Sequence, residues 1–167
     1  MGMYAWKDDE KVTVEMDEKR LNRFVLNCTW DEGRGKVTFI LCNPSIGDEG
    51  QADLTLRRCV NYARNWGYGS LDVVNLFSQI TTDPSALIES QESRQGENDS
   101  YIIRSIEEAD RVIFGWGEVE KRFPKRAGEV KALVPTDKQF YLSRTANGKY
   151  PRHPSRLRRD LLPVSWG

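Results

Sequence analysis

Residues 37–41 read Val37-Thr38-Phe39-Ile40-Leu41, an almost wholly apolar run, and Cys42-Asn43-Pro44-Ser45 follows at once. A continuous apolar run of this length is typical of a strand covered on both faces, as in a parallel sheet. A second run of this character extends from Leu71 to Phe77, and the segment from Asp53 to Trp66 between the two has apolar residues at helical spacing. These segments predict a strand, a helix and a second strand of one parallel sheet.

The rest of the chain continues this alternation. Runs rich in β-branched and aromatic residues predict further strands at Val12 to Val14, Arg23 to Asn27, Arg111 to Gly117 and Gln139 to Leu142. Further helices are predicted from about Asn98 to Ala109, from Lys125 to Leu133, and from Asp83-Pro84 towards Leu87 and Ile88. We expect a single α/β domain over residues 1–167, a three-layer sandwich with a mostly parallel central sheet flanked by helices.

The composition fits one globular domain and points to no polyanionic partner. Of the 167 residues, 38% are hydrophobic, and 25 Lys and Arg balance 25 Asp and Glu. The charges are unevenly placed, because arginines crowd residues 144–159 while Asp and Glu are dense in residues 8–18. No apolar run reaches the roughly 18 residues of a membrane span, and residues 1–10 lack the hydrophobic stretch of a signal peptide. We therefore expect a cytoplasmic protein with no membrane partner, of unknown oligomeric state.

Neither the cysteines nor the glycines indicate a cofactor or a metal. Cys28, Cys42 and Cys59 form no CxxC pair, and the chain has one histidine, so a zinc site is not expected. We expect free, largely buried thiols that are poor nucleophiles. The patterns GxxxxGK followed by Ser or Thr, and GxGxxG, are both absent, which argues against kinase-type and dinucleotide-binding sites.

Polar residues follow the predicted strands where packing alone would not require them. They occur at Asn43-Pro44-Ser45, at Asn75, at Gly115-Trp116-Gly117 and in residues 143–155. In open sheets of this kind, ligands bind beyond the carboxyl ends of the strands, so we expect these segments to form one site. Each also has a simpler interpretation: a tight turn for residues 43–45, a backbone partner for the Asn75 amide and core packing for Trp116.

His153 and two carboxylates are the candidates for catalysis, together with Asn43. His153 lies between Pro151 and Pro154, which restrict the backbone, and such rigidity suits an imidazole that must face a developing negative charge. Asp48 and Asp53 lie just beyond the first polar loop and can supply a carboxylate that activates water. As loop charges they can equally be inert.

Contacts to a ligand are expected from further residues at the same strand ends and from the basic C-terminal segment. The predicted substrate-binding residues are Pro44, Ser45, Asn75, Phe77, Trp116 and Ser155. Arg152, Arg156 and Arg158 would suit a phosphate or a nucleic-acid backbone, and their alternative interpretation is a solvated basic surface.

Motifs spread along nearly the whole chain resemble a known family. They are Leu41-Cys42-Asn43-Pro44-Ser45, Leu54-Thr55-Leu56-Arg57-Arg58-Cys59, Trp66-Gly67-Tyr68-Gly69, Val73-Val74-Asn75-Leu76-Phe77, Thr82-Asp83-Pro84, Glu97-Asn98-Asp99, Trp116-Gly117 and Arg152-His153-Pro154. In this order they are similar to the bacterial and phage family DUF1643. Its name records an unknown function, so the resemblance implies a family but no activity.

The order of the polar loops is also similar, more distantly, to the uracil-DNA glycosylase superfamily. That resemblance implies a glycosylase-like sandwich in which Asn43 positions the attacking water, Asn75 reads an extruded base and His153 stabilises the departing base anion. It also implies that the segment from Arg156 to Arg159 approaches the minor groove of DNA. The chain departs from the superfamily pattern where Ser45 follows Pro44 and where Arg156 follows Ser155.

Three functions remain open on the sequence. The first is hydrolysis of an N-glycosidic bond in DNA or in a nucleotide derivative, with Asn75 reading the Watson–Crick edge of a base held in a pocket. The second is binding of a nucleotide or a nucleotide-derived signal without chemistry, which the neutral net charge favours. The third is an interaction module that binds DNA or protein through the C-terminal arginines.

Overall fold

A central mixed sheet organises the protein. The computed structural model describes residues 3–83, 87 and 92–167, and this part of the chain forms a seven-stranded sheet, a two-stranded ribbon and three α-helices. In sheet order the seven strands are β2 (Lys11–Met16), β3 (Arg23–Thr29), β6 (Ser70–Asn75), β4 (Lys36–Leu41), β7 (Arg111–Phe114), β8 (Gln139–Tyr141) and β9 (Val164–Ser165). The ribbon pairs β1 (Tyr4–Ala5) with β5 (Gln51–Ala52), and the helices are α1 (Leu54–Asn65), α2 (Glu92–Glu108) and α3 (Pro124–Ala132).

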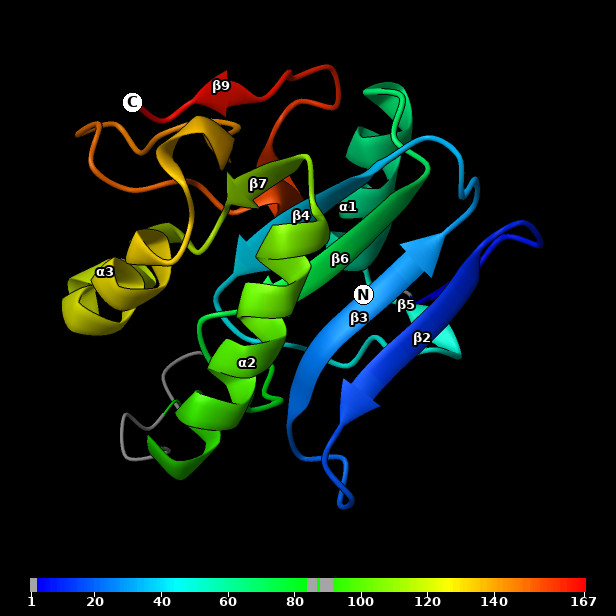
Figure 1. The fold of residues 1–167 in the computed structure, drawn as a ribbon, viewed down its shortest axis with the longest axis horizontal. Helices are drawn as coiled ribbons and strands as arrows, with labels where there is room; N and C mark the ends of the chain where they lie inside the picture. The colour runs from blue at the N-terminus through cyan, green and yellow to red at the C-terminus, as the bar shows by residue number, and fades with distance from the viewer. Residues whose placement is uncertain (1–2, 84–86, 88–91) are drawn as a thin grey trace.

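The sheet is parallel at its centre and antiparallel towards its edges. β4 runs parallel to β6 on one side and to β7 on the other, and β7 runs parallel to β8. β2 and β3 form an antiparallel hairpin that attaches to β6, as Figure 1 shows, and β9 pairs antiparallel with β8. The predicted α/β class is confirmed, but the sheet is mixed rather than mostly parallel, because the N-terminal hairpin adds two antiparallel strands beside β6.

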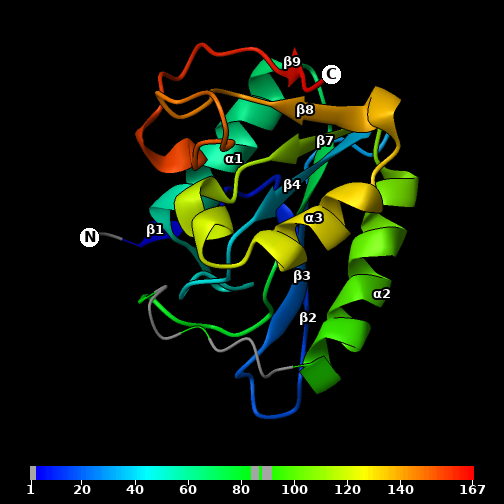
Figure 2. The same cartoon turned by 90° about the vertical axis from the view of Figure 1, so that its left-hand side faces the viewer.

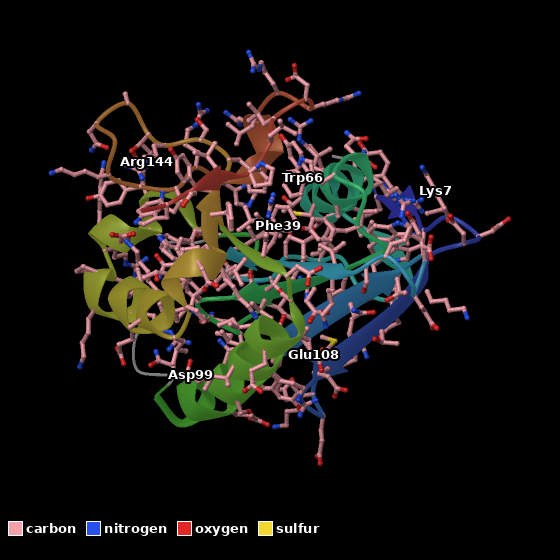
Figure 3. All side chains as sticks on the ribbon, turned by 45° about the horizontal axis from the view of Figure 1, so that its top comes forward. Lys7, Phe39, Trp66, Asp99, Glu108 and Arg144 are labelled. Carbon is pink, nitrogen blue, oxygen red and sulfur yellow. The ribbon has the colours of Figure 1, made fainter. Side chains whose placement is uncertain are left out.

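Helices cover both faces of the sheet. α1 lies on one face, and α2 and α3 lie on the other (Figure 2). Alternate residues of β4 supply the two cores, since Phe39 and Leu41 pack on the α1 side while Ile40 packs with α2 and α3. Phe39 stacks on Trp66 at the end of α1, with 5.9 Å between the ring centroids (Figure 3). Two-sided burial explains why residues 37–41 form a continuous apolar run.

Most predicted elements are present with shifted ends. Asp53 caps α1 rather than lying within it, and Gly67, with φ of 88°, follows its last turn, a conformation that glycine adopts without strain. β6 ends at Asn75 and β7 ends at Phe114, so both are shorter than predicted, whereas α2 begins before Asn98. The helix predicted from Asp83-Pro84 falls largely outside the described residues. The short strands β1, β5 and β9 carry no periodic signal and were not predicted.

The three cysteines are free, and burial raises the pKa of Cys28 and of Cys42 to about 12 and also raises that of Cys59. None of these thiols is therefore ionised at neutral pH.

Within the described residues, no helix has the length and apolar character needed to cross a membrane.

Candidate functional site

The carboxyl ends of β4 and β6 meet at a small cavity. Leu41 lies opposite Asn75 in this parallel pair, so the loop that begins at Cys42 starts beside Asn75. The cavity has a volume of about 60 Å³. Its lining combines polar and apolar side chains, namely Arg23, Leu41, Asn43, Pro44, Ser45, Asp53, Thr55, Leu56, Val73, Asn75 and His153. The structure thus brings Asn43, Asn75 and His153 together from sequence positions far apart.

Arg58 of α1 holds the histidine loop in place. Its Nε donates to the carbonyl of Pro154 at 3.2 Å, and its Nη2 donates to the carbonyl of Leu157. These two bonds tie both ends of the short turn after His153 to a rigid helix. The sequence gives no hint of this role, because Arg58 lies 95 residues before His153 and reads as an ordinary helix-surface charge.

Gly115 lets the same loop approach the sheet closely. A Cβ at this position would lie 2.9 Å from Cδ2 of Leu41 and 3.3 Å from Cδ of Pro154. Both contacts are shorter than ordinary van der Waals distances, so a larger residue would push the loop away from the end of β4. The glycine after β7 therefore serves close packing of the His153 loop, which agrees with the interpretation of glycines at strand ends as sites of close approach.

His153 is a neutral imidazole with a defined tautomer. The backbone N–H of Ser155 donates to its Nδ1 at 3.2 Å, and the Ser155 hydroxyl lies 2.9 Å from the same atom. A backbone N–H can only donate, so Nδ1 is the acceptor and the neutral ring carries its proton on Nε2. Burial lowers the pKa of His153, against an opposing effect of the Asp53 carboxylate. The ring is therefore a hydrogen-bond donor through Nε2 at neutral pH.

We expect NMR to observe this state directly, because His153 is the only histidine in the chain. The imidazole nitrogen spectrum should show the proton on Nε2 and a pKa below the ordinary value of 6.5. The neutral ring then stabilises the fold fully above pH 6.5, and this contribution is lost as the pH falls below 6.5 towards the folded-state pKa. His153→Gln should remove that part of the pH dependence of unfolding. A pKa above 6.5, or a proton on Nδ1, would contradict the assignment.

Asn75 is the most unusual residue of the cavity. Its side chain is almost fully buried, with 1% of the residue exposed, and neither Nδ2 nor Oδ1 has a hydrogen-bond partner in the described part of the chain. Leaving a buried amide unpaired costs about 1–3 kcal/mol. The sequence flagged Asn75 because an amide at the end of an apolar strand needs a partner. The described residues supply no partner, so among them the simpler interpretation, a backbone partner for this side chain, does not hold.

Asn43 presents an acceptor to the cavity. Its Nδ2 donates to the carbonyls of Pro44 at 3.0 Å and Thr81 at 2.8 Å. Because only the NH2 group can donate to carbonyls, these bonds fix the orientation of the amide. Its Oδ1 accepts no hydrogen bond from the described residues. Asn43 therefore both fastens the loop, as the turn interpretation expects, and leaves one acceptor for a ligand or a water.

Asp53 places a carboxylate at the same cavity. Its Oδ1 accepts from the backbone N–H of Leu56 at 2.9 Å and so caps α1. Its Oδ2 has no hydrogen bond within the described part of the chain. Asp53 is therefore not the inert loop charge that the sequence offered as the alternative to a base, because it caps α1; its role as a base stays a prediction.

Arg23 is a cavity residue that sequence reasoning missed. It reads as the first residue of a strand, a position where a charge is normally exposed, but only 2% of it is exposed. Its Nη1 donates to the carbonyl of Gly47 at 2.5 Å, and its Nε has no partner among the residues that the structure describes. Burial lowers the pKa of Arg23 to about 10, against the opposing charges of Asp53 and Asp48. The guanidinium remains charged at neutral pH.

Two larger hollows adjoin the cavity. One has a volume of about 360 Å³ and shares Ser45, Asp53 and Thr55 with the cavity. The other has a volume of about 480 Å³ and shares His153 with it. Ser155 and Arg156 line both hollows, and Arg152 lines the larger one. The exposed guanidinium groups of Arg152 and Arg156 take part in none of the ion pairs formed by the described residues.

Several predicted site residues lie elsewhere. Asp48 accepts the backbone N–H groups of Gly50 and Gln51 in its own loop and does not line the cavity. Phe77 and Trp116 are each 2% exposed and pack in the core on the α2 and α3 side. Arg158 is an exposed residue whose Nε lies 3.3 Å from a carboxylate oxygen of Asp160. The core interpretation of Trp116 is therefore the one that the structure favours.

Comparison with known proteins identifies one family. A family model described as "Protein of unknown function (DUF1643)" matches residues 23–155 of the chain. The matched region begins at Arg23, ends at Ser155 and includes every residue that lines the small cavity. No curated protein and no solved structure matches the chain.

Proposed function

The chain belongs to the DUF1643 family, and from that premise we propose that its cavity binds the edge of a nucleobase and supports hydrolysis of an N-glycosidic bond. The observation that carries this proposal is the unpartnered buried amide of Asn75, which lines the same cavity as the neutral imidazole of His153. A side-chain amide with both Nδ2 and Oδ1 available is complementary to the adjacent donor and acceptor of a base edge. The distant resemblance to uracil-DNA glycosylases assigns the same two residues to base recognition and leaving-group stabilisation.

The volume of the cavity limits which part of such a ligand can enter it. About 60 Å³ is room for roughly two water molecules at ~30 Å³ each, which is less than a whole base requires. One edge of the ring enters the cavity beside Asn75, and the sugar and phosphate lie in the adjoining hollows near Arg152 and Arg156. Those two arginines are the groups available to a phosphate. The substrate is then DNA or a smaller nucleotide derivative.

The chemistry needs one nucleophile and one leaving group. A water held by the Oδ1 of Asn43 attacks the anomeric carbon, and the carboxylate of Asp53 takes its proton. The carbon–nitrogen bond breaks, and its electron pair leaves with the base as an anion. The Nε2–H of His153 donates a hydrogen bond to that anion. Asp53 then releases its proton to solvent and the base anion takes one up, so the products are the neutral free base and a sugar that carries a hydroxyl at the anomeric carbon.

The test is release of base by the purified protein. We expect abasic sites in at least one of a panel of uracil-containing, mismatched and modified DNAs, or free base from a nucleotide derivative. Asp53→Asn is the sharpest variant, because asparagine preserves the helix cap but removes the base, and we expect a rate loss of about 10²-fold or more. Asp137→Asn, an exposed carboxylate away from the cavity, is the matched control.

A non-catalytic nucleotide-binding protein is the second candidate, which the small volume of the cavity favours. It predicts ligand-dependent stabilisation in a thermal shift without any product in chromatography. If neither base release nor stabilisation by any nucleobase-containing ligand is observed, both candidates are wrong.

A further inference from the structure

Arg23 differs from the other buried arginines of the protein. Arg57 lies 2.6 Å from a carboxylate oxygen of Glu10, and Arg126 lies 2.8 Å from a carboxylate oxygen of Asp99. Arg23 is as buried as Arg126 and more buried than Arg57, yet none of the ion pairs formed by the described residues includes it. Among the described residues, its guanidinium donates one hydrogen bond, to the carbonyl of Gly47, and its Nε–H has no acceptor. A buried charge without a contacting counter-charge is costly and therefore needs a reason.

The surroundings of Arg23 give that reason. It lines the cavity together with Asn75 and His153. Nδ2 of Asn75 has no acceptor among the described residues. Nε2 of His153 carries the proton of the neutral ring, because Nδ1 is the acceptor. The walls are therefore rich in donors, one of which carries a full positive charge. The Asp53 carboxylate also lines the cavity but forms no ion pair with Arg23. The missing partner of this constellation is an acceptor with negative charge.

We propose that the cavity receives an anionic oxygen group of the ligand, a phosphoryl or a carboxylate, which accepts a hydrogen bond from the Nε of Arg23. This inference deepens the proposed function, on which it rests for the nature of the whole ligand, by giving that ligand a negative charge at the end that enters the cavity. Two sources share the required chemistry, namely a carboxylate attached to the base itself and the phosphoryl group of a nucleotide. The carboxylate keeps the base edge in the cavity as proposed above, whereas a phosphoryl group would occupy the cavity in place of that edge. The outer arginines are not part of the inference, since they do not line the cavity.

The experiment measures anion binding by the purified protein in thermal shift and calorimetry. Orthophosphate, acetate and chloride are compared at equal ionic strength, followed by uridine, uridine monophosphate and a uracil that carries a ring carboxylate. We expect saturable stabilisation by orthophosphate or acetate but not by chloride. If orthophosphate binds, uridine monophosphate should bind more tightly than uridine. If acetate binds, the uracil that carries a ring carboxylate should bind more tightly than uridine. Arg23→Met should weaken that binding at least 10-fold, and Arg23→Lys should restore part of it. Arg34→Met, which removes an exposed arginine outside the cavity, should bind like the parent protein.

Several outcomes would overturn the inference. They are equal effects of all three inorganic anions, or unchanged oxyanion binding by folded Arg23→Met. If Arg23→Met does not fold, Asn75→Leu is tested in its place, because this variant keeps Arg23 while the leucine fills the cavity. Unchanged oxyanion binding by Asn75→Leu would also overturn the inference. Oxyanion binding without any nucleobase binding would contradict the proposed function alone. Base binding or release that is the same in Arg23→Met and in the parent protein would contradict this inference alone.

Discussion

The substitution Asn75→Leu is expected to make the protein more stable and to abolish ligand binding. The buried amide of Asn75 has no partner among the described residues, so replacing it with an apolar group of similar branching should raise the free energy of unfolding by about 1–3 kcal/mol. For a chain of this length the unfolding temperature should rise by about 2–4 °C per kcal/mol. The affinity for a nucleobase-containing ligand should fall by ~100-fold or more, because the recognising donor and acceptor are gone.

Asn98 provides the matched control for this prediction. It is also a buried asparagine, with 1% exposed, but its Nδ2 donates to the carbonyls of Asn75 at 2.9 Å and Leu76 at 3.4 Å. Asn98→Leu removes the side-chain donor to the Asn75 carbonyl, while Leu76 still accepts from Nε of Arg126 at 2.8 Å, and it should lower the free energy of unfolding by about 1–3 kcal/mol. Chemical denaturation of both variants measures the contrast. If Asn75→Leu destabilises the protein as much as Asn98→Leu does, the Asn75 side chain has a structural role and is not kept for a ligand.

A gain in stability from a single substitution in a core strand carries a functional meaning. Selection removes variants that fall below a stability threshold, and a polar group that lowers stability persists where activity needs it. Asn75 lies at the end of β6, between the buried residues Val74 and Leu76. The apolar residues Leu41, Leu56 and Val73 line the same cavity as the Asn75 side chain, so an apolar side chain at position 75 would have apolar neighbours. Under the proposed function, the cost of the unpaired amide is offset when a ligand binds.

Local pattern predicted the elements of the fold, but not all of their pairings. Two-sided burial of residues 37–41 and 71–75 shows in the sequence as unbroken apolar runs, and both segments are central strands. Nothing in residues 11–29 specifies that the hairpin β2–β3 attaches antiparallel to β6, because strand pairing at a distance depends on the final packing. β9 is likewise a strand of two residues held by its contacts with β8, too short to produce a periodic signal.

The candidate site was predicted in part for the same reason. Asn43, Asn75 and His153 were found because polar residues at strand ends stand out against apolar neighbours, and all three line one cavity. Arg23 was missed because the sequence does not show that the start of β3 is covered by the loop around Gly47. Trp116 lies at a strand end and yet points into the core, since a residue two positions beyond a strand has no fixed side.

Away from the site, one buried carboxylate holds the N-terminal segment to α1. Both oxygens of Glu10 accept from Arg57, at 2.7 and 2.6 Å, Oε2 also accepts from Arg64 at 2.9 Å, and Oε1 accepts the backbone N–H of Lys7 at 2.8 Å. Burial alone would raise the pKa of Glu10, but these hydrogen bonds and charges outweigh it and lower the pKa from 4.5 to about 2. This carboxylate therefore stabilises the fold fully above pH 4.5. Its contribution is lost as the pH falls from 4.5 towards 2.

We expect Glu10→Gln to lower the free energy of unfolding at neutral pH by about 3 kcal/mol, since one pKa unit corresponds to ~1.4 kcal/mol and the variant leaves two arginines without their shared partner. Urea denaturation at a series of pH values measures both the loss and its pH dependence. The parent protein should lose stability steeply between pH 4.5 and 2, and Glu10→Gln should lose it less steeply over that range. Asp9→Asn is the control, because Asp9 is exposed and its one side-chain bond within the described residues is to Arg64 at 3.0 Å. Its effect on the free energy of unfolding should stay below about 1 kcal/mol. An equal loss in the two variants would contradict the assignment of this stability to the buried, bidentate contact between Glu10 and Arg57.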